Sequence, residues 1–196
     1  MLNPIISNRL YAAALLAAAF FSFAFLLNAA WIPVKAELAQ WLIERSWRQV
    51  VAGGEYTRPW PWADTRPAAI LEMPGHGIRL VVLEGNSGRN LAFGPVFGDG
   101  TADSGDVVIS GHRDTHFRFL ENLEPGDHLK LTRKDGVKLF EIVQTDIVDS
   151  STTQMLMDPG MDRVSLVTCY PFDTPAAGGP LRYVVTALPV RLPPTS

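Results

Sequence analysis

From residue 68 onward the sequence is a series of short apolar runs separated by turn residues, and this pattern constrains the fold more than any other feature. The turn sequences Pro-Gly-His-Gly at 74–77 and Lys-Asp-Gly at 134–136 each lie between two such runs, as expected for strands joined by a turn. The predicted strands are residues 70–73, 78–83, 107–110, 129–132, 139–143, 164–168 and 183–188. So many short strands with so few helices predict a mainly β fold, a closed or nearly closed β-barrel.

One short helix is predicted between these strands. Asp114 is a residue type that caps helix N-termini, so a helix is predicted to begin near Thr115, with Phe117 and Leu120 facing the core. In this arrangement His112 lies where the strand before it ends.

The N-terminal part of the chain has the composition of a membrane segment. Residues 10–32 carry no charged side chain and consist mainly of alanine, leucine and phenylalanine. A helix of about 20 apolar residues can cross a bilayer, whereas the apolar part of a cleaved signal peptide is usually about 7–15 residues long. We therefore predict an uncleaved transmembrane helix over residues 10–32, after a short N-terminal segment, residues 1–9. Cleavage near Asn28-Ala29-Ala30 is the alternative, and both place the rest of the chain outside the cytoplasm.

Residues 33–67 are predicted to connect the membrane segment to the strands. Within them, apolar and polar residues follow one another along residues 36–51 with the spacing of an amphipathic helix. Gly53 and Gly54 are expected to end this helix. We interpret it as a juxtamembrane spacer without chemistry of its own, and a partner-binding surface is the alternative.

A linker is predicted to follow the spacer helix. Residues 57–67 contain three prolines, which disfavour both helix and central strand. Trp60 and Trp62 in this linker are expected to pack onto the folded domain, and a place at the membrane interface, where tryptophan is enriched, is the alternative. The folded domain is predicted to span residues 68–192, with a C-terminal tail at residues 193–196.

The charge of the chain argues against a nucleic-acid partner. The formal net charge is −3, and no block of lysine or arginine is present. Proteins that bind nucleic acids use basic patches to neutralise phosphates, so no nucleic-acid partner is predicted.

Cys169 is the only cysteine in the chain, so it cannot form an internal disulfide. It follows the strand-like run at 164–168 directly. Exported proteins normally pair their cysteines, which favours a thiol kept free for chemistry. The alternatives are a buried cysteine that serves only as a small apolar residue and a cysteine that forms an intermolecular disulfide.

Two other residues have the chemistry that a reactive thiol needs. Acyl transfer through a thiol requires a thiolate, an acid that protonates the leaving amine, and a donor for the oxyanion. Cys169, His112 and Arg182 supply one residue for each task, and Arg182 stays cationic. Asp114 could orient His112, although its use as a helix cap is the preferred interpretation.

The remaining titratable clusters are interpreted without a metal or a cofactor. His116 lies four residues after His112, but a break between strand and helix separates them and no third ligand is apparent. Asp99, Asp103 and Asp106 lie in a glycine-rich stretch that favours a solvated loop over a calcium site.

Three ordered motifs resemble those of the sortases. They are Ser-Gly-His-Arg-Asp at 110–114, Leu-Val-Thr-Cys at 166–169 and Leu-Arg-Tyr-Val-Val at 181–185. The resemblance covers residues 68–192 and implies an eight-stranded β-barrel in a membrane-anchored cysteine transpeptidase. Such an enzyme cleaves a Leu-Pro-x-Thr-Gly-like sorting signal and transfers the acyl group to an amine acceptor.

The resemblance also implies a role for each site residue. Cys169 corresponds to the nucleophile, His112 to the general acid and base, and Arg182 to the residue that stabilises the transition state. Thr168 corresponds to the residue that lines the substrate site. Ser165 departs mildly from the usual family motif Thr-Leu-x-Thr-Cys.

Sequences around these motifs resemble the class GN sortases of Gram-negative bacteria. The relevant segments are Arg-Asp-Thr-His-Phe at 113–117 and Tyr-Pro-Phe-Asp at 170–173. This resemblance implies a single-pass protein of the inner, cytoplasmic membrane with its catalytic domain in the periplasm. The implied partners are the membrane, a protein with a C-terminal sorting signal, and an amine acceptor that the sequence does not identify.

Two other functions are compatible with the residues alone. A thiol endopeptidase would use water in place of the acceptor amine, because both attack the same thioester. A non-catalytic, membrane-tethered binding barrel would bury Cys169, but it gives no reason for His112 and Arg182 to accompany the thiol.

Overall fold

The computed structural model of the chain describes residues 4–154, 157–158, 160–174 and 178–190. The predicted tail at 193–196 lies outside these described residues, as do residues 1–3 of the predicted N-terminal segment. The chain divides into two compact units, residues 1–41 and 42–196, and each is described by itself.

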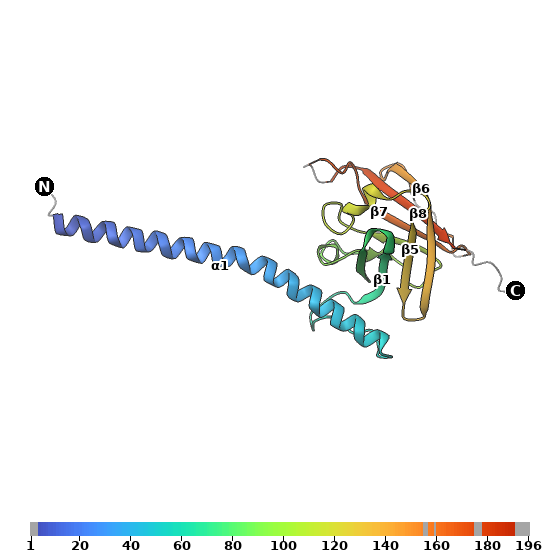
Figure 1. Ribbon diagram of the computed structural model, residues 1–196, viewed down its shortest axis with the longest axis horizontal. Helices are drawn as coiled ribbons and strands as arrows, with labels where there is room; N and C mark the ends of the chain where they lie inside the picture. The colour runs from blue at the N-terminus through green and yellow to red at the C-terminus, as the bar shows by residue number, and fades with distance from the viewer. Residues whose placement is uncertain (1–3, 155–156, 159, 175–177, 191–196) are drawn as a thin grey trace. The chain divides into compact units, whose positions relative to one another are not determined.

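Within the described residues the structure has one α-helix, three 3₁₀ helices and eight strands (Figure 1). The helices are α1 (Pro4–Val51), η1 (Pro74–His76), η2 (Asn90–Ala92) and η3 (Arg118–Asn122). The strands are β1 (Pro67–Met73), β2 (Ile78–Leu83), β3 (Val96–Phe97), β4 (Asp106–Ser110), β5 (His128–Arg133), β6 (Gly136–Asp149), β7 (Arg163–Cys169) and β8 (Leu181–Pro189).

Helix α1 supplies the whole described part of the first unit. The sequence predicts two helices, at 10–32 and 36–51, but the structure has one continuous helix with Pro33 inside it. Judged on the described residues, no helix has the length and apolarity that crossing a membrane requires.

The C-terminal end of α1 confirms the predicted stop signal. Gly53 has a φ of +89°, in the left-handed region that favours glycine. Its N–H donates to the Val50 carbonyl at 3.1 Å, and the Gly54 N–H donates to the Gln49 carbonyl at 3.0 Å. These two bonds form a Schellman motif, which satisfies carbonyl groups at the end of the helix.

In the second unit, the last turns of α1 pack against the barrel. Ile43, Trp47 and Val50 are at most 3% exposed. They form an apolar cluster with four strand residues, which are Ile70, Val81, Leu83 and Val96. Residues 42–51, predicted to be a spacer, are therefore part of the folded unit.

The linker that follows the helix packs only in part. The Trp60 ring lies 5.2 Å from the Phe93 ring in a T-shaped contact, whereas Trp62 is 82% exposed. The expectation that both tryptophans pack onto the domain is therefore correct for Trp60 and wrong for Trp62.

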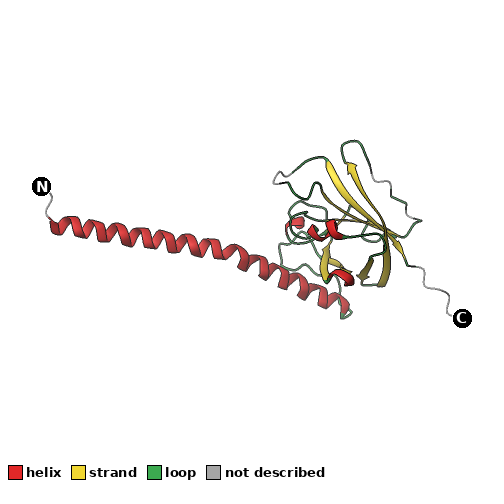
Figure 2. Cartoon of the chain, turned by 45° about the horizontal axis from the view of Figure 1, so that its top comes forward, coloured by secondary structure: helices red, strands yellow, loops and turns green. Residues whose placement is uncertain are grey.

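The strands close into a barrel in the order β1-β2-β3-β4-β7-β8-β6-β5. Figure 2 shows these strands and the loops that join them. Two of the neighbouring pairs are parallel, β2 with β3 and β4 with β7. The prediction of an eight-stranded closed barrel is confirmed, and every predicted strand is present. The structure adds the two-residue strand β3 and extends β6 to Asp149.

The core fills the barrel with side chains from alternate positions of each strand. Its largest fully buried side chains include Leu71, Met73, Phe97, Ile109, Phe117, Leu120, Leu129, Phe140, Ile142 and Leu166. Burial of each such side chain stabilises the fold by roughly 1.5–3 kcal/mol. The barrel wall is therefore a rigid support for side chains that point outward from it.

The predicted short helix begins later than the sequence suggests. Helix η3 begins at Arg118, and no side chain caps it. The prediction that Asp114 caps a helix near Thr115 is therefore wrong. Phe117 and Leu120 are fully buried, as predicted.

Candidate active site

The candidate site forms where β4 and β7 end side by side. The two strands pair in parallel, and paired residues are always 57 positions apart, up to Ser110 with Val167. The Gly111 N–H donates to the Val167 carbonyl at 3.1 Å, so the pairing extends one residue further. The same separation aligns His112 with Cys169.

Arg182 joins this pair from the neighbouring strand β8. Strands β7 and β8 are antiparallel, and Cys169 and Arg182 are direct partners in their register. The Tyr170 N–H donates to the Leu181 carbonyl at 3.1 Å, which continues the ladder past this pair. The structure thus brings the predicted nucleophile, acid and cation to adjacent positions at one end of the barrel.

All three residues lie on the outer side of the barrel wall. The reference residues that face the core are Ile109 in β4, Leu166 in β7 and Val185 in β8. Cys169 and Arg182 each lie three positions from the core-facing residue of their own strand. Because side chains alternate along a strand, both extend to the outer face. His112 lies two residues beyond the end of β4, and its side chain is exposed to solvent.

A glycine allows the chain to reach this geometry just before His112. A Cβ added at Gly111 would lie 2.7 Å from the Phe117 ring, which is fully buried. A contact this short requires the ring to move, and the packed core around it resists such movement. Glycine at 111 therefore lets the Phe117 ring close the core directly beneath His112.

Thr168 links the same two strands. It is 2% exposed, and its hydroxyl donates to the Gly111 carbonyl at 2.8 Å. This buried hydrogen bond joins the residue before Cys169 to the residue before His112. The predicted contact of Thr168 with substrate stays a prediction.

The three site residues differ in exposure. His112 is exposed, while Cys169 and Arg182 are partly buried. The Arg182 Nη1 donates to the carbonyls of Gly179 at 2.6 Å and Leu181 at 2.9 Å. These bonds hold the guanidinium against the backbone at the start of β8.

Asp114 interacts with Arg113 rather than with a helix N-terminus. The Arg113 Nε donates to Asp114 Oδ1 at 2.7 Å, and Nη2 donates to Oδ2 at 3.0 Å. The hydrogen bond from Arg113 lowers the pKa of the Asp114 carboxyl, with smaller contributions from Arg118 and His112. The predicted orientation of His112 by Asp114 stays a prediction.

Sequence reasoning missed Arg113, which is 6% exposed although it carries a full charge. It follows His112 directly, inside a motif quoted above for another residue. Strand alternation could not have found it, because Arg113 lies in the turn at 113–117, beyond the end of β4. Its burial comes from contacts with carbonyls that follow Cys169 in the chain.

His116 lies close to the site without sharing a helix with His112. Burial lowers the pKa of His116, a hydrogen bond with the Ala92 backbone raises it, and the nearby His112 lowers it further. Residues 113–117 form turns that precede η3, and His112 lies before them. The two imidazoles therefore do not share a helix face, as expected from the sequence.

The prediction that Asp106 lies in a solvated loop is wrong, because Asp106 is the first residue of β4. Its carboxylate is fully buried in β4, where Arg163 Nε donates to Oδ1 at 2.9 Å and Nη2 to Oδ2 at 2.6 Å. The Asp158 N–H adds a third bond at 2.9 Å. In the described part of the chain no three His, Cys, Asp or Glu side chains are grouped to hold a metal ion.

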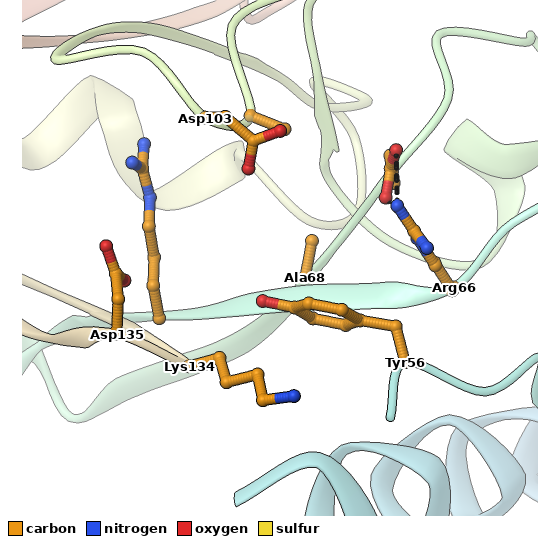
Figure 3. Close-up of a pocket in the computed structure, with 9 residues that line it drawn as sticks. Tyr56, Arg66, Ala68, Asp103, Lys134 and Asp135 are labelled. Atoms are coloured by element: carbon orange, nitrogen blue, oxygen red, sulfur yellow. Dashed lines mark hydrogen bonds and ion pairs between the residues drawn. The ribbon is translucent and has the colours of Figure 1, made fainter. Parts of the chain in front are cut away.

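A separate cavity of about 470 Å³ is lined by residues that include Tyr56, Arg66, Asp103 and Lys134 (Figure 3). It lies near the start of β1, the end of β2, the loop before β4 and the β5–β6 turn. Tyr56 lies in it between Arg66, 5.0 Å from the ring, and Lys134, 5.5 Å from the ring. None of the predicted site residues lines this cavity, so its size does not identify the site.

Comparison with known proteins agrees with the motifs. Residues 71–190 match the sortase domain family. The chain is 35% identical to sortase D of Bacillus subtilis over 125 residues, 60% of this chain and 61% of that protein. It is 27% identical to sortase SrtE1 of Streptomyces coelicolor over 125 residues, 53% of this chain and 36% of that protein. The chain thus spans less than two thirds of the length of these relatives.

Solved structures show the same relationship. The chain resembles sortase A from Corynebacterium diphtheriae with a TM-score of 0.58 and 26% identity, over 69% of this chain and 66% of that chain. The family match covers more than half of the sequence and includes all three motifs and the barrel that carries them. The chain therefore belongs to the sortase family.

Proposed function

We propose that this chain is a cysteine transpeptidase that cleaves a sorting signal and transfers its acyl part to an amine. The observation that supports this best is the alignment of His112, Cys169 and Arg182 across three neighbouring strands. A binding barrel has no need for a thiol, an imidazole and a guanidinium on one face.

The reaction begins with attack of the Cys169 thiolate on the carbonyl carbon of the scissile peptide bond. Arg182 stabilises the negative oxygen of the tetrahedral intermediate. The bond to nitrogen then breaks, and His112 gives its proton to the departing amine. The product of this first step is a thioester between Cys169 and the acyl part of the substrate.

The second step returns the enzyme to its starting state. An acceptor amine attacks the thioester, and His112 removes a proton from the attacking nitrogen. The carbon–sulfur bond breaks, and Cys169 leaves as thiolate. One amide is broken and one is formed, so the reaction needs no other source of energy.

The family relationship supports a Leu-Pro-x-Thr-Gly-like signal at the C-terminus of a protein substrate. Cleavage would fall between threonine and glycine, with the acyl group of threonine carried on Cys169. The acceptor is proposed only by class, as a primary amine.

Intact mass spectrometry of the full chain in detergent tests this proposal. With a Leu-Pro-x-Thr-Gly peptide, we expect Cys169 to gain the mass of the peptide up to threonine. A small added amine is expected to remove this adduct and yield ligated peptide. The Cys169→Ala variant is expected to form neither product.

The other outcomes separate the alternatives. Hydrolysed peptide that an added amine does not divert would indicate a thiol endopeptidase. A chain that forms no adduct with several related peptides, and whose Cys169 resists alkylation, would instead be a binding barrel.

We also propose that residues 10–32 anchor the protein in the cytoplasmic membrane as a single span. The uncharged, apolar composition of this segment supports the proposal. The motifs that resemble class GN sortases support a periplasmic catalytic domain. In fractionated Gram-negative cells, the chain is expected to stay in the membrane fraction after alkaline extraction. Added protease is expected to digest the barrel only after the outer membrane has been opened. Release of the chain by alkali, or resistance of the barrel to protease in spheroplasts, would contradict this topology.

A further inference from the structure

Arg113 connects the backbone that follows His112 with the backbone that follows Cys169. Its Nη1 donates to the Pro171 carbonyl at 2.6 Å, and its Nη2 donates to the Thr174 carbonyl at 2.9 Å. These carbonyls lie two and five residues after the thiol. The side chain thus crosses between the two segments that leave the site.

Both segments lie beyond the paired part of β4 and β7. The register of the two strands ends at Ser110 and Val167, and the Gly111 N–H bond lies one residue further. The position of His112 relative to Cys169 therefore depends on contacts beyond this pairing, and Arg113 supplies one of them in addition to the Thr168–Gly111 bond.

The shape of the guanidinium suits this position. Nε and Nη2 bind the two oxygens of Asp114, while Nη1 and Nη2 bind the loop carbonyls. A planar group with donors in fixed directions can hold three partners at once, which the single ammonium of lysine cannot do with the same geometry. Asp114 also balances the charge that Arg113 brings into the interior.

Arg118 offers a comparison on the same loop. Its Nη1 donates to the Phe172 carbonyl at 3.2 Å, and its Nη2 donates to Asp173 at 3.3 Å. The Arg118 side chain is 47% exposed, against 6% for Arg113. Exposed contacts of this kind hold a loop less firmly than buried ones.

We propose that Arg113 is a positioning residue that fixes the register in which the Cys169 sulfur and the His112 imidazole face each other. This inference rests on the transpeptidase function proposed above. Arg113 acts through the loop carbonyls and has no step of its own in the reaction.

The test compares Arg113→Gln with Arg118→Gln in the full chain in detergent. Single-turnover acylation gives a rate constant at saturating peptide and a half-saturating peptide concentration. For Arg113→Gln we expect a rate constant lower by about 10–100-fold, because small displacements of reacting groups have effects of this size. The half-saturating concentration is expected to stay within about threefold, and Arg118→Gln is expected to match the wild type. Equal effects of the two variants, or an effect on half-saturation alone, would overturn the proposal.

Arg113→Lys separates geometry from charge. Lysine keeps the positive charge but not the planar fork, so the acylation rate is expected to stay at least about tenfold below the wild type. Full recovery of the rate would show that charge alone is needed and would overturn the positioning role.

Two further measurements keep the proposal testable. If Arg113→Gln does not fold, the Asp114→Asn variant is used, because it weakens the ion pair that holds the Arg113 guanidinium and changes only an exposed side chain. An acylation rate equal to that of the wild type would then overturn the proposal.

If the wild type forms no thioester, the transpeptidase function fails, but alkylation by iodoacetamide still reports on the reactivity of Cys169 without a sorting signal. Slower alkylation of Arg113→Gln than of Arg118→Gln would support positioning, and equal rates would overturn it.

Discussion

Replacing His112 with alanine is expected to slow acylation of Cys169 by about 10³-fold, within the 10²–10⁴-fold that a positioned acid or base contributes. The amine that leaves the tetrahedral intermediate needs a proton. His112 is the ionisable side chain that the β4–β7 register aligns with Cys169. Intact mass spectrometry of the thioester over time measures the loss directly.

His128→Ala is a matched control, because His128 is an exposed histidine at the start of β5. It is expected to retain the wild-type rate. Added imidazole is expected to restore part of the acylation by His112→Ala, since the missing group is then supplied from solution. A loss of less than tenfold in His112→Ala would mean that another group protonates the amine.

Replacing Asp106 with asparagine is expected to lower the free energy of unfolding of the barrel by about 3 kcal/mol. Removing one charge of a buried ion pair leaves the other without its partner, which costs about 3–5 kcal/mol. We expect a loss at the lower end of this range of about 3–5 kcal/mol, because the Arg163 side chain is 25% exposed and water can solvate its charge in part. Urea unfolding followed by tryptophan fluorescence measures the change.

The same carboxylate makes stability depend on pH. Burial alone raises the pKa of Asp106, but the bonds from Arg163 and the Asp158 N–H outweigh it and hold the pKa below its ordinary value. Because the folded pKa lies below the unfolded value of about 3.9, the stabilisation is complete above that pH. It is lost as the pH falls through the folded pKa, and Asp106→Asn should lack this part of the acid dependence.

Asp162→Asn is the control for both measurements. Asp162 pairs with Lys138 at 2.9 Å, but these side chains are 43% and 55% exposed. An exposed pair contributes about 0–1 kcal/mol, so the variant is expected to stay within 1 kcal/mol of the wild type. A similar loss in both variants would show that burial of Asp106 has no special effect.

Much of the barrel was predictable because its signals are local. Pro74 and Gly136 mark turns, and the apolar runs beside them have strand length. The same holds for the stop of α1 at Gly53. The predicted site residues came from residue chemistry and motif order, and the barrel register then placed His112, Cys169 and Arg182 together.

What escaped prediction depends on contacts between distant segments. Strand β3 has two residues and no pattern of its own, and its pairing comes from Leu83 and Ser110. The glycine-rich sequence around Asp106 predicts a loop, and only the ion pair with Arg163 shows that the residue is buried in a strand. The pattern around Ile43 predicts a separate amphipathic helix, and only the strands that cover Ile43 show that it belongs to the core.

The alignment of β4 with β7 also bears on how this protein can change in evolution. Residues 111–162 lie between the two paired segments, so the turn residues 150–154 can gain or lose residues without altering either strand. Deletion of one residue inside β7 would instead turn the thiol from the outer face toward the core. Insertions and deletions among descendants of this sequence are therefore expected to accumulate in the loops, while the strand lengths before His112 and Cys169 are inherited unchanged.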